Sequence, residues 1–240
     1  MRRSSTDDIS ARVGRVEWAR VARQLDDGGW ASLGPLLRAS ECAALRRGFD
    51  RAADFRSTVD MARHRFGRGV YRYFAYPLPA PVAALRGALY ARLAPIANAW
   101  MARLGRAIVY PAALETYLGA CHAAAQRRPT PLLLRYGAGD YNCLHQDLYG
   151  ALAFPLQVVI PLSRQRDYDG GELIFAEQRP RSQSRATAVR PAAGEAIVFT
   201  NRERPVAGTR GDYRVQMRHG VSTITRGQRT ALGVIFHDAT

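Results

Sequence analysis

The second half of the chain consists of short apolar segments separated by residues that are typical of turns. Eight such segments follow the sequence RRPTP, namely LLLRY, YNCLHQD, FPLQVVIPL, ELIFA, RATAVR, EAIVFT, YRVQMRHGV and TALGVIFHD. Stretches such as GAGD and RPAAG lie between them and favour turns. No gap has room for a crossover helix, so the strands are expected to be antiparallel. The pattern predicts a jelly roll, that is, a double-stranded β-helix of about eight antiparallel strands.

The first half of the chain has a different pattern, in which apolar residues recur at helical spacing. Ser40 is a candidate N-cap, and Pro95 is expected to bend or divide the longest helix. We therefore predict an α+β protein, with residues 1–126 as a mainly helical support region and residues 127–240 as the β-roll. Helices are expected at 9–27, 38–53, 80–105 and 111–128, and extended segments at 28–37 and 67–76.

The chain carries a formal net charge of +15, and all 35 of its basic residues are Arg. The absence of Lys suggests a coding bias, so an Arg by itself is weakly informative. The excess of positive charge is compatible with a polyanionic partner such as nucleic acid and also with an ordinary solvated surface. Arg-rich turns that could grip a phosphate backbone occur at RQRD, EQRPRSQSR and NRERPVAGTR.

Three cysteines, Cys42, Cys121 and Cys143, lie far apart and form no CxxC pair. This pattern favours reduced thiols in a cytoplasmic protein. The Arg residues near the start are not followed by an apolar segment, and no apolar run is long enough to span a membrane. We therefore expect a cytoplasmic protein without a signal peptide or a membrane span. The sequence does not indicate an oligomeric state.

A candidate metal site lies in the stretch YNCLHQD. In an extended strand, His145 and Asp147 point to the same face. His219, in the seventh predicted strand, is the candidate for a third ligand. Two imidazoles and one carboxylate on one face of an octahedron leave three positions open, an arrangement that suits Fe(II) oxygen chemistry. The alternative is a pair of ordinary buried strand residues.

Arg229, ten residues after His219, could anchor a co-substrate. Its guanidinium fork is suited to a bidentate pair with a carboxylate, such as the distal end of a dicarboxylic keto acid whose other end chelates iron. Arg226 is a rival anchor, but it lies in the turn TRGQ and is expected to face solvent.

The motifs LLRYGAGDYNCLHQD, DGGELIF, VRPAAGEAIVF and RHGVSTITRGQRTALGVIFHD occur in this order. With them, residues 131–238 resemble the 2-oxoglutarate- and Fe(II)-dependent dioxygenases, and prolyl hydroxylases in particular. The resemblance implies that His145, Asp147 and His219 are the catalytic iron ligands, that Arg229 binds 2-oxoglutarate, and that Tyr136 hydrogen-bonds it. It also implies Fe(II), 2-oxoglutarate and O2 as cofactor and co-substrates.

The resemblance implies coupling of 2-oxoglutarate decarboxylation to hydroxylation of a C–H bond. The wider pattern is similar to a prokaryotic group described as oxygenases acting on alkylated nucleic acid, which would make the reaction an oxidative demethylation in DNA repair. Two alternatives stay open: a prolyl-hydroxylase-like enzyme acting on a protein or peptide, and an inactive β-roll that binds nucleic acid.

The other three histidines are interpreted as structural or surface residues. His237 and Asp238 are adjacent and point to opposite faces of a strand, so they cannot both bind one metal. His64 and His122 are expected to pack or to face solvent. Cys143 is expected to pack as a small apolar residue beneath the metal.

Overall fold

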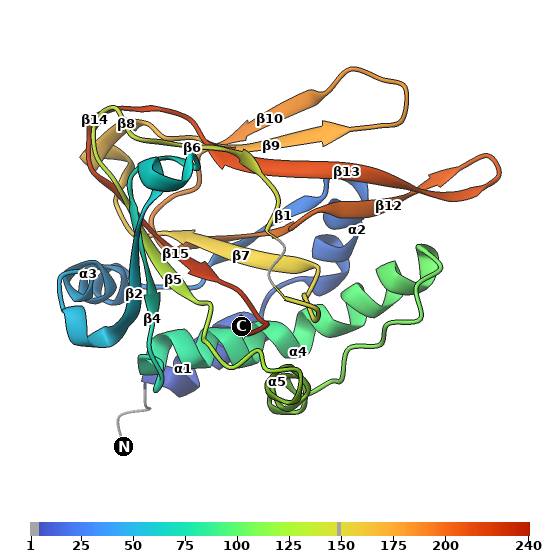
Figure 1. Cartoon of the computed structure of the whole chain (residues 1–240), viewed down its shortest axis with the longest axis horizontal. Helices are drawn as coiled ribbons and strands as arrows, with labels where there is room; N and C mark the ends of the chain where they lie inside the picture. Colours follow the sequence, from blue (N-terminus) through green and yellow to red (C-terminus); the bar gives the residue numbers. More distant parts are fainter. Residues whose placement is uncertain (1–4, 148–149) are drawn as a thin grey trace.

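The computed structural model describes residues 5–147 and 150–240 and contains two antiparallel sheets that face each other (Figure 1). The larger sheet has the order β1 (Trp30–Pro35), β11 (Glu195–Thr200), β7 (Leu156–Pro161), β15 (Arg229–Val234), β5 (Leu132–Tyr136), β4 (Val70–Phe74), β2 (Phe55–Asp60). The smaller sheet has the order β10 (Arg185–Val189), β9 (Leu173–Gln178), β13 (Gly211–Val221), β6 (Tyr141–His145), β3 (Gly67–Arg68), and β12 (Glu203–Gly208) pairs with β13. A short ribbon joins β14 (Ile224–Gly227) to β8 (Tyr168–Gly170). The predicted α+β roll is confirmed.

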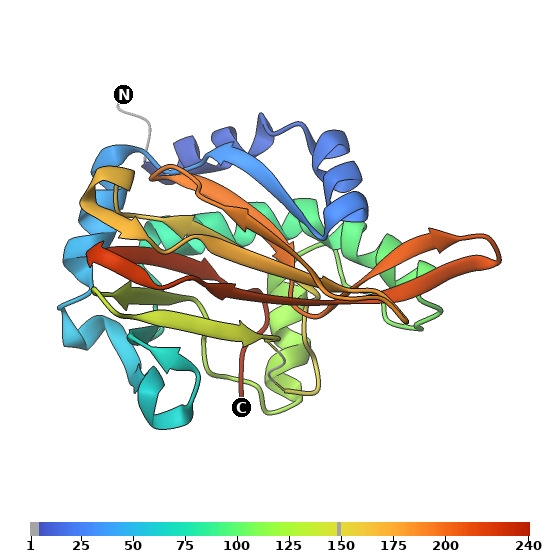
Figure 2. The same cartoon turned by 90° about the horizontal axis from the view of Figure 1, so that it is seen from above.

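Helices cover the outer face of the larger sheet, while the smaller sheet lies on the other side (Figure 1). They are α1 (Ser5–Gly14), α2 (Trp18–Gly28), α3 (Ala39–Gly48), α4 (Ala80–Arg103) and α5 (Leu114–Ala123), with short 3-10 turns at η1 (Ala52–Asp54), η2 (Met61–His64) and η3 (Gln165–Asp167). The β12–β13 hairpin projects away from the body of the molecule, as both views show (Figure 1, Figure 2).

Two details of the helical prediction were wrong, and one of the two outcomes expected at Pro95 does not occur. The helix expected over 9–27 is two helices, and the second ends at Gly29 in the left-handed conformation. Ser40 is not an N-cap, because α3 begins one residue earlier and the Glu41 carboxylate accepts a bond of 2.6 Å from the backbone N–H of Arg38. Pro95 does not divide α4, which continues through it as one helix.

Four strands from the first half of the chain are part of the sheets. β1, β2 and β4 lie in the larger sheet, and β3 pairs with β6 in the smaller one. The extended segments predicted at 28–37 and 67–76 are therefore confirmed as β1 and β4. The boundary at residues 126 and 127 stays a division of the sequence pattern, because the sheets use strands from both sides of it.

The apolar residues of the larger sheet alternate between two cores. Val158, Val198 and Leu232 pack against the helices, whereas their strand neighbours Val159, Ile197 and Ala231 face the smaller sheet. This is the two-residue period of a strand, and burial on both faces explains why β7 and β15 are apolar almost throughout. Members of the inner core, among them Val159, Phe199 and Ala231, also line a cavity.

The predicted turn NRERPVAGTR is largely a strand, since β12 covers Glu203–Gly208. Among the described residues, no helix combines the length and the apolar character that crossing a membrane requires.

Candidate metal and co-substrate site

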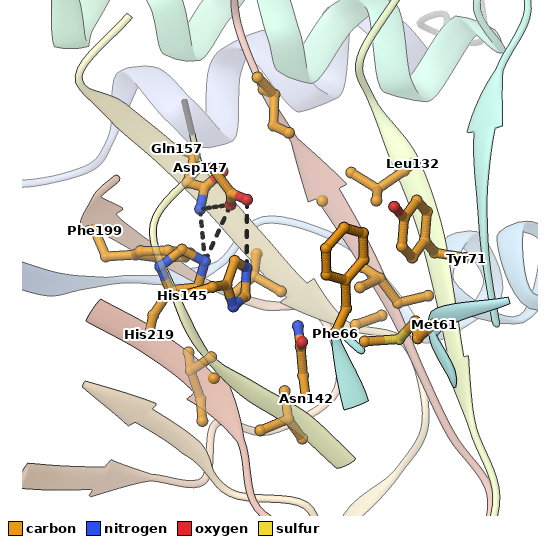
Figure 3. A pocket seen from close by; sticks show the side chains of 18 of the residues that line it. Met61, Phe66, Tyr71, Leu132, Asn142, His145, Asp147, Gln157, Phe199 and His219 are labelled. Atoms are coloured by element: carbon orange, nitrogen blue, oxygen red, sulfur yellow. Dashed lines mark hydrogen bonds and ion pairs between the residues drawn. The ribbon is translucent and has the colours of Figure 1, made fainter. Parts of the chain in front are cut away.

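A cavity of about 250 Å³ lies between the two sheets. His145, Asp147 and His219 line it (Figure 3). Tyr136 and Arg229 also belong to its lining. The structure therefore brings all five residues that the sequence singled out to one cavity. Their side chains come from β6, the residues that follow it, β13, β5 and β15.

The three candidate ligands converge at one point of the cavity wall. His219 and His145 are directly paired across β13 and β6, with ring centroids 4.2 Å apart. Asp147 lies just after β6 ends; its Oδ1 is 3.3 Å from His145 Nε2 and its Oδ2 is 3.1 Å from His219 Nε2. One ligand atom from each residue lies within 4.8 Å of the others. This spacing lets one ion contact all three.

The surroundings of the two imidazoles prepare them to donate lone pairs. The carbonyl of Cys143 accepts a bond of 2.8 Å from His145 Nδ1–H, so in the neutral ring Nε2 is unprotonated and faces the cluster. Burial opposes protonation of His145, but Asp147 outweighs it and raises the pKa of this imidazole, so metal binding must displace a proton here. Burial lowers the pKa of His219 in spite of its carboxylate neighbour. Burial opposes ionisation of Asp147, but His219 and His145 outweigh it and hold the pKa of this carboxyl well below its usual range. Neutral imidazoles and an ionised carboxylate are the forms that bind a divalent metal.

Gln157 is a member of this cluster that the sequence analysis missed. It is buried in β7. Its amide Nε2 donates one bond of 2.7 Å to Asp147 Oδ2 and lies 3.1 Å from His219 Nε2. It thus fixes the orientation of two of the three candidate ligands. A signal was available, because Gln157 is the only polar residue in the strand segment FPLQVVIPL.

Arg229 is a buried cation that has no ionic partner among the described residues. The buried Arg86 and Arg204 do have one: Arg86 is 2.7 Å from Asp238, and Arg204 is 2.5 Å from Glu177. Over residues 5–147 and 150–240, no carboxylate lies within ion-pair distance of Arg229, and its Nε has no hydrogen-bond acceptor. Burying an uncompensated charge costs several kcal/mol, so a cavity-lining guanidinium of this kind is suited to an anionic ligand.

Tyr136 and Gly171 shape the surroundings of Arg229. Tyr136 is paired with Arg229 across β5 and β15, and the guanidinium carbon lies 5.7 Å from the centre of the ring. Burial raises the pKa of Tyr136, so its hydroxyl keeps its proton and can donate it in a hydrogen bond. Gly171 has φ of 68°, and a Cβ there would lie 3.0 Å from Arg229 Cδ. The glycine of DGGELIF thus leaves room for the arginine.

The other candidate residues of the sequence analysis do not line the cavity. Arg226 is exposed and pairs with Asp169 at 2.6 Å, so it does not reach the cavity. His237 is buried outside the cavity, and His64 is exposed. His122 Nε2 lies 2.8 Å from Asp238 Oδ2, a contact that the sequence did not reveal.

Cys143 corrects one expectation, because its side chain is exposed instead of packed beneath the metal site. Only its carbonyl takes part, through the bond from His145. Cys42 and Cys121 are buried, and all three cysteines are free thiols.

The Arg-rich turns are partly neutralised by their own carboxylates. Arg164 pairs with Asp167, and both Arg179 and the buried Arg204 pair with Glu177. The turns therefore carry less unbalanced charge than the sequence suggested.

Comparison with known proteins assigns the family. The model of the Oxygenase-NA family, described as "Oxygenase, catalysing oxidative methylation of damaged DNA", matches residues 69–239. The chain belongs to this family. Two Mycobacterium tuberculosis proteins, from strains H37Rv and CDC 1551, both described as uncharacterized, are 49% identical to it over 226 residues; these cover 94% of this chain and 92% of each relative.

Solved structures show the same fold in Fe(II)-dependent oxygenases. A prolyl hydroxylase of Trichoplax adhaerens, solved with a hypoxia-inducible-factor peptide, superposes with a TM-score of 0.61 at 14% identity, covering 98% of this chain and 94% of that one. A 2-oxoglutarate–Fe(II) oxygenase family oxidoreductase of Burkholderia pseudomallei gives 0.53 at 20% identity, covering 92% and 91%. These likenesses confirm the jelly roll.

Family, fold and donor set agree on the class of enzyme. The chain is an oxygenase, and its cavity offers a donor set of the kind that Fe(II) oxygen chemistry uses. Two independent observations show that the residues of the cavity fit Fe(II) and 2-oxoglutarate. Two imidazoles and a carboxylate converge on one point, and a buried guanidinium in the same cavity has no ionic partner among the described residues.

Proposed function

We propose that the enzyme oxidises N-alkyl groups on bases of single-stranded or flipped-out nucleic acid, with His145, Asp147 and His219 holding Fe(II) and Arg229 holding the distal carboxylate of 2-oxoglutarate. The observation that carries the proposal is the unpaired, buried Arg229 in the cavity that the two imidazoles and the carboxylate also line. The description of the family supports nucleic acid as the substrate.

When bound, Fe(II) lets O2 convert 2-oxoglutarate into succinate and CO2 while one oxygen atom enters a C–H bond of the substrate. A hydroxylated N-methyl group is unstable and leaves as formaldehyde, which restores the base. A base in a duplex must leave the stack to reach the cavity. This chemistry removes a methyl group and would serve DNA repair.

The residues of the chain bind, orient and exclude water. Gln157 holds Asp147 in place, and Arg229 with the protonated Tyr136 hydroxyl orients the co-substrate. Phe199 and Leu134 give the cavity apolar walls, which protect it from bulk water. We place the enzyme in the cytoplasm, in keeping with its three free thiols.

The first test concerns the metal and co-substrate. Anaerobic addition of Fe(II) and 2-oxoglutarate should produce a weak visible charge-transfer band, which His219→Ala abolishes. Arg229→Ala should mainly raise the KM for 2-oxoglutarate, and Arg226→Ala is the matched control. An unchanged KM in Arg229→Ala would move the anchor elsewhere.

The second test concerns the substrate. Succinate and formaldehyde should be released when N-methylated single-stranded DNA is added, and not when Pro-containing peptides are added. Stimulation by the peptides alone would favour the prolyl-hydroxylase-like alternative. A protein that gives no band and no succinate would be an inactive roll.

A further inference from the structure

The segment 61–68, with the sequence MARHRFGR, forms one wall of the cavity mouth. It contains η2 and β3 and connects β2 to β4. Met61 and Phe66 from this segment line the cavity together with the candidate iron ligands. Figure 3 shows the ring of Phe66 on the opposite side of the cavity from His145, Asp147 and His219. Because Phe66 lines the cavity and is also exposed to solvent, this segment borders an opening of the cavity.

The backbone of the segment is fixed to the strand that carries the first candidate ligand. The carbonyl of Phe66 accepts a bond of 2.9 Å from the N–H of Cys143, whose own carbonyl holds His145. Gly67 has φ of 128°, and a Cβ there would lie 2.3 Å from the carbonyl oxygen of Tyr141. Only glycine allows this approach. Phe66 thus has a defined position relative to the site.

Phe66 is an exposed aromatic residue at an opening of the cavity. Its side chain is 47% exposed, and the ring of His64 stacks on it at 5.4 Å with an angle of 22°. Phe66 differs from the other exposed apolar side chains in that it also lines the cavity, where aromatic rings commonly contact ligands. The stacked ring of His64 packs against Phe66 and restricts its orientation.

Positive charge surrounds this ring. Arg63, Arg65 and Arg68 are all exposed, and Asp60 is the only acidic residue between positions 55 and 76. The contact of Arg63 with Asp60 is 3.6 Å long and largely exposed, so it neutralises little of this charge. Aromatic rings interleaved with cations are the pattern that binds single-stranded nucleic acid, in which bases stack and phosphates pair with Arg.

We propose that segment 61–68 is a docking platform for single-stranded nucleic acid, on which Phe66 stacks with a base at the cavity mouth while Arg63, Arg65 and Arg68 contact phosphates. The proposal rests on the proposed function, since it names how that site takes its substrate. It assigns substrate binding to this segment and not to the Arg-rich turns, because no residue of those turns lines the cavity. An extended peptide would offer neither a repeating negative charge nor regularly spaced rings.

Binding of a fluorescent single-stranded oligonucleotide by the whole protein tests the platform. Phe66→Ala should weaken affinity about tenfold or more, since stacking on one aromatic ring contributes roughly 1–3 kcal/mol. Phe66→Trp should retain the affinity. Leu144→Ala is the matched control, because Leu144 lies on β6, is 48% exposed and does not line the cavity.

Two further measurements separate stacking from charge. An oligonucleotide that contains 2-aminopurine should lose fluorescence on binding, and Phe66→Ala should prevent this loss. Replacing Arg63, Arg65 and Arg68 by Ala should reduce the slope of log K against log salt by about 2, because each phosphate contact contributes about 0.7 on single strands. A control triple variant removes the exposed Arg15, Arg23 and Arg92 from the helical side and should keep the slope.

The outcomes distinguish the platform from the proposed function. If the wild type releases succinate with methylated DNA but Phe66→Ala binds DNA as tightly as Leu144→Ala does, the platform is wrong and the function stands. If Phe66→Ala and the platform triple variant lose affinity but no methylated oligonucleotide stimulates succinate release, the platform stands and the proposed substrate chemistry is wrong. Equal losses in both triple variants would show that only net charge matters and would overturn the platform.

Discussion

The molecule contains two buried groups of acidic and basic side chains that have similar compositions and different surroundings. His145, Asp147 and His219 face the cavity. In the second group, Asp238 Oδ1 lies 2.7 Å from Arg86 and Oδ2 lies 2.8 Å from His122. Both groups contain an aspartate that is at least nine-tenths buried and is bonded to histidine.

The difference lies in what completes each group. Arg86 is a permanent cation; besides Asp238, its guanidinium donates to the carbonyls of Ile235, Phe236 and His237, so this group fastens α4 to the C-terminal segment. The cavity group instead directs imidazole nitrogens and carboxylate oxygens to a common point. A closed network of this kind stabilises the fold, whereas a convergent set of lone pairs is suited to a metal.

The largest expected effect is the loss of activity on removal of an iron ligand. We expect His219→Ala to reduce succinate formation by more than the roughly 10- to 100-fold that loss of an outer hydrogen-bond partner costs. Some loss of stability without metal is also expected, because the variant removes a contact that stabilises the buried carboxylate of Asp147, so turnover is compared per folded protein. A variant that keeps wild-type turnover would exclude His219 as a ligand.

Removal of Arg86 should instead destabilise the fold and leave metal binding unchanged. Arg86→Ala leaves Asp238 as a buried charge without its guanidinium partner, which costs about 3–5 kcal/mol of unfolding free energy. Urea denaturation measures this loss. In the fraction that remains folded, metal affinity should match the wild type, and a selective loss of metal binding without destabilisation would contradict the comparison.

The sequence pattern within and between neighbouring strands was enough to predict which side chains meet in the cavity. His145 and Asp147 are two residues apart at the end of one strand, and Arg229 starts a strand soon after His219, so strand parity and motif order identify them. The assignment of their roles remains a prediction. The two-sheet roll was also predictable, because its strands have short connections and a clear two-residue period.

Contacts between distant parts of the sequence could not be predicted in the same way. Arg86 lies in an apolar helical pattern, and nothing local shows that its partner is 152 residues away. Likewise, β1 pairs with β11 across more than 150 residues, so its place in the larger sheet follows only from the folded structure. The Ser40 error has a local origin: Glu41 bonds to the N–H of Arg38, three residues before it, which makes Arg38 the cap.

A smaller effect is expected at Gln157, which supports the cavity group. Gln157→Leu removes the amide that bonds to Asp147, and we expect Mn(II) affinity to fall by roughly 10- to 100-fold. Calorimetric titration measures it. The control is Gln126→Leu in the other group, where the amide donates to the carbonyls of Leu152 and Asp238; this variant should lose stability and keep its metal affinity.

The smallest expected effect is a dependence of stability on pH that arises beside the Arg86 group. Burial, reinforced by the positive charge of Arg86 and opposed by Asp147 and Asp238, lowers the pKa of His237 to about 4. The unfolded chain takes up a proton near pH 6.5 and the folded chain does not. Stability is therefore complete above that pH and decreases as the pH falls towards 4, by about 2 kcal/mol between pH 7 and pH 5.

His237→Asn tests this dependence, because Asn cannot titrate and can still accept the bond that His237 Nδ1 receives from the N–H of Phe154. The difference in unfolding free energy between wild type and variant should shrink as the pH falls from 7 to 5, since only the wild type loses the contribution of His237. His219 and the other titrating groups are present in both proteins and cancel in this difference. A difference that stays constant with pH would mean that His237 has the same pKa in the folded and the unfolded protein, and the buried surroundings assigned to it would then be wrong.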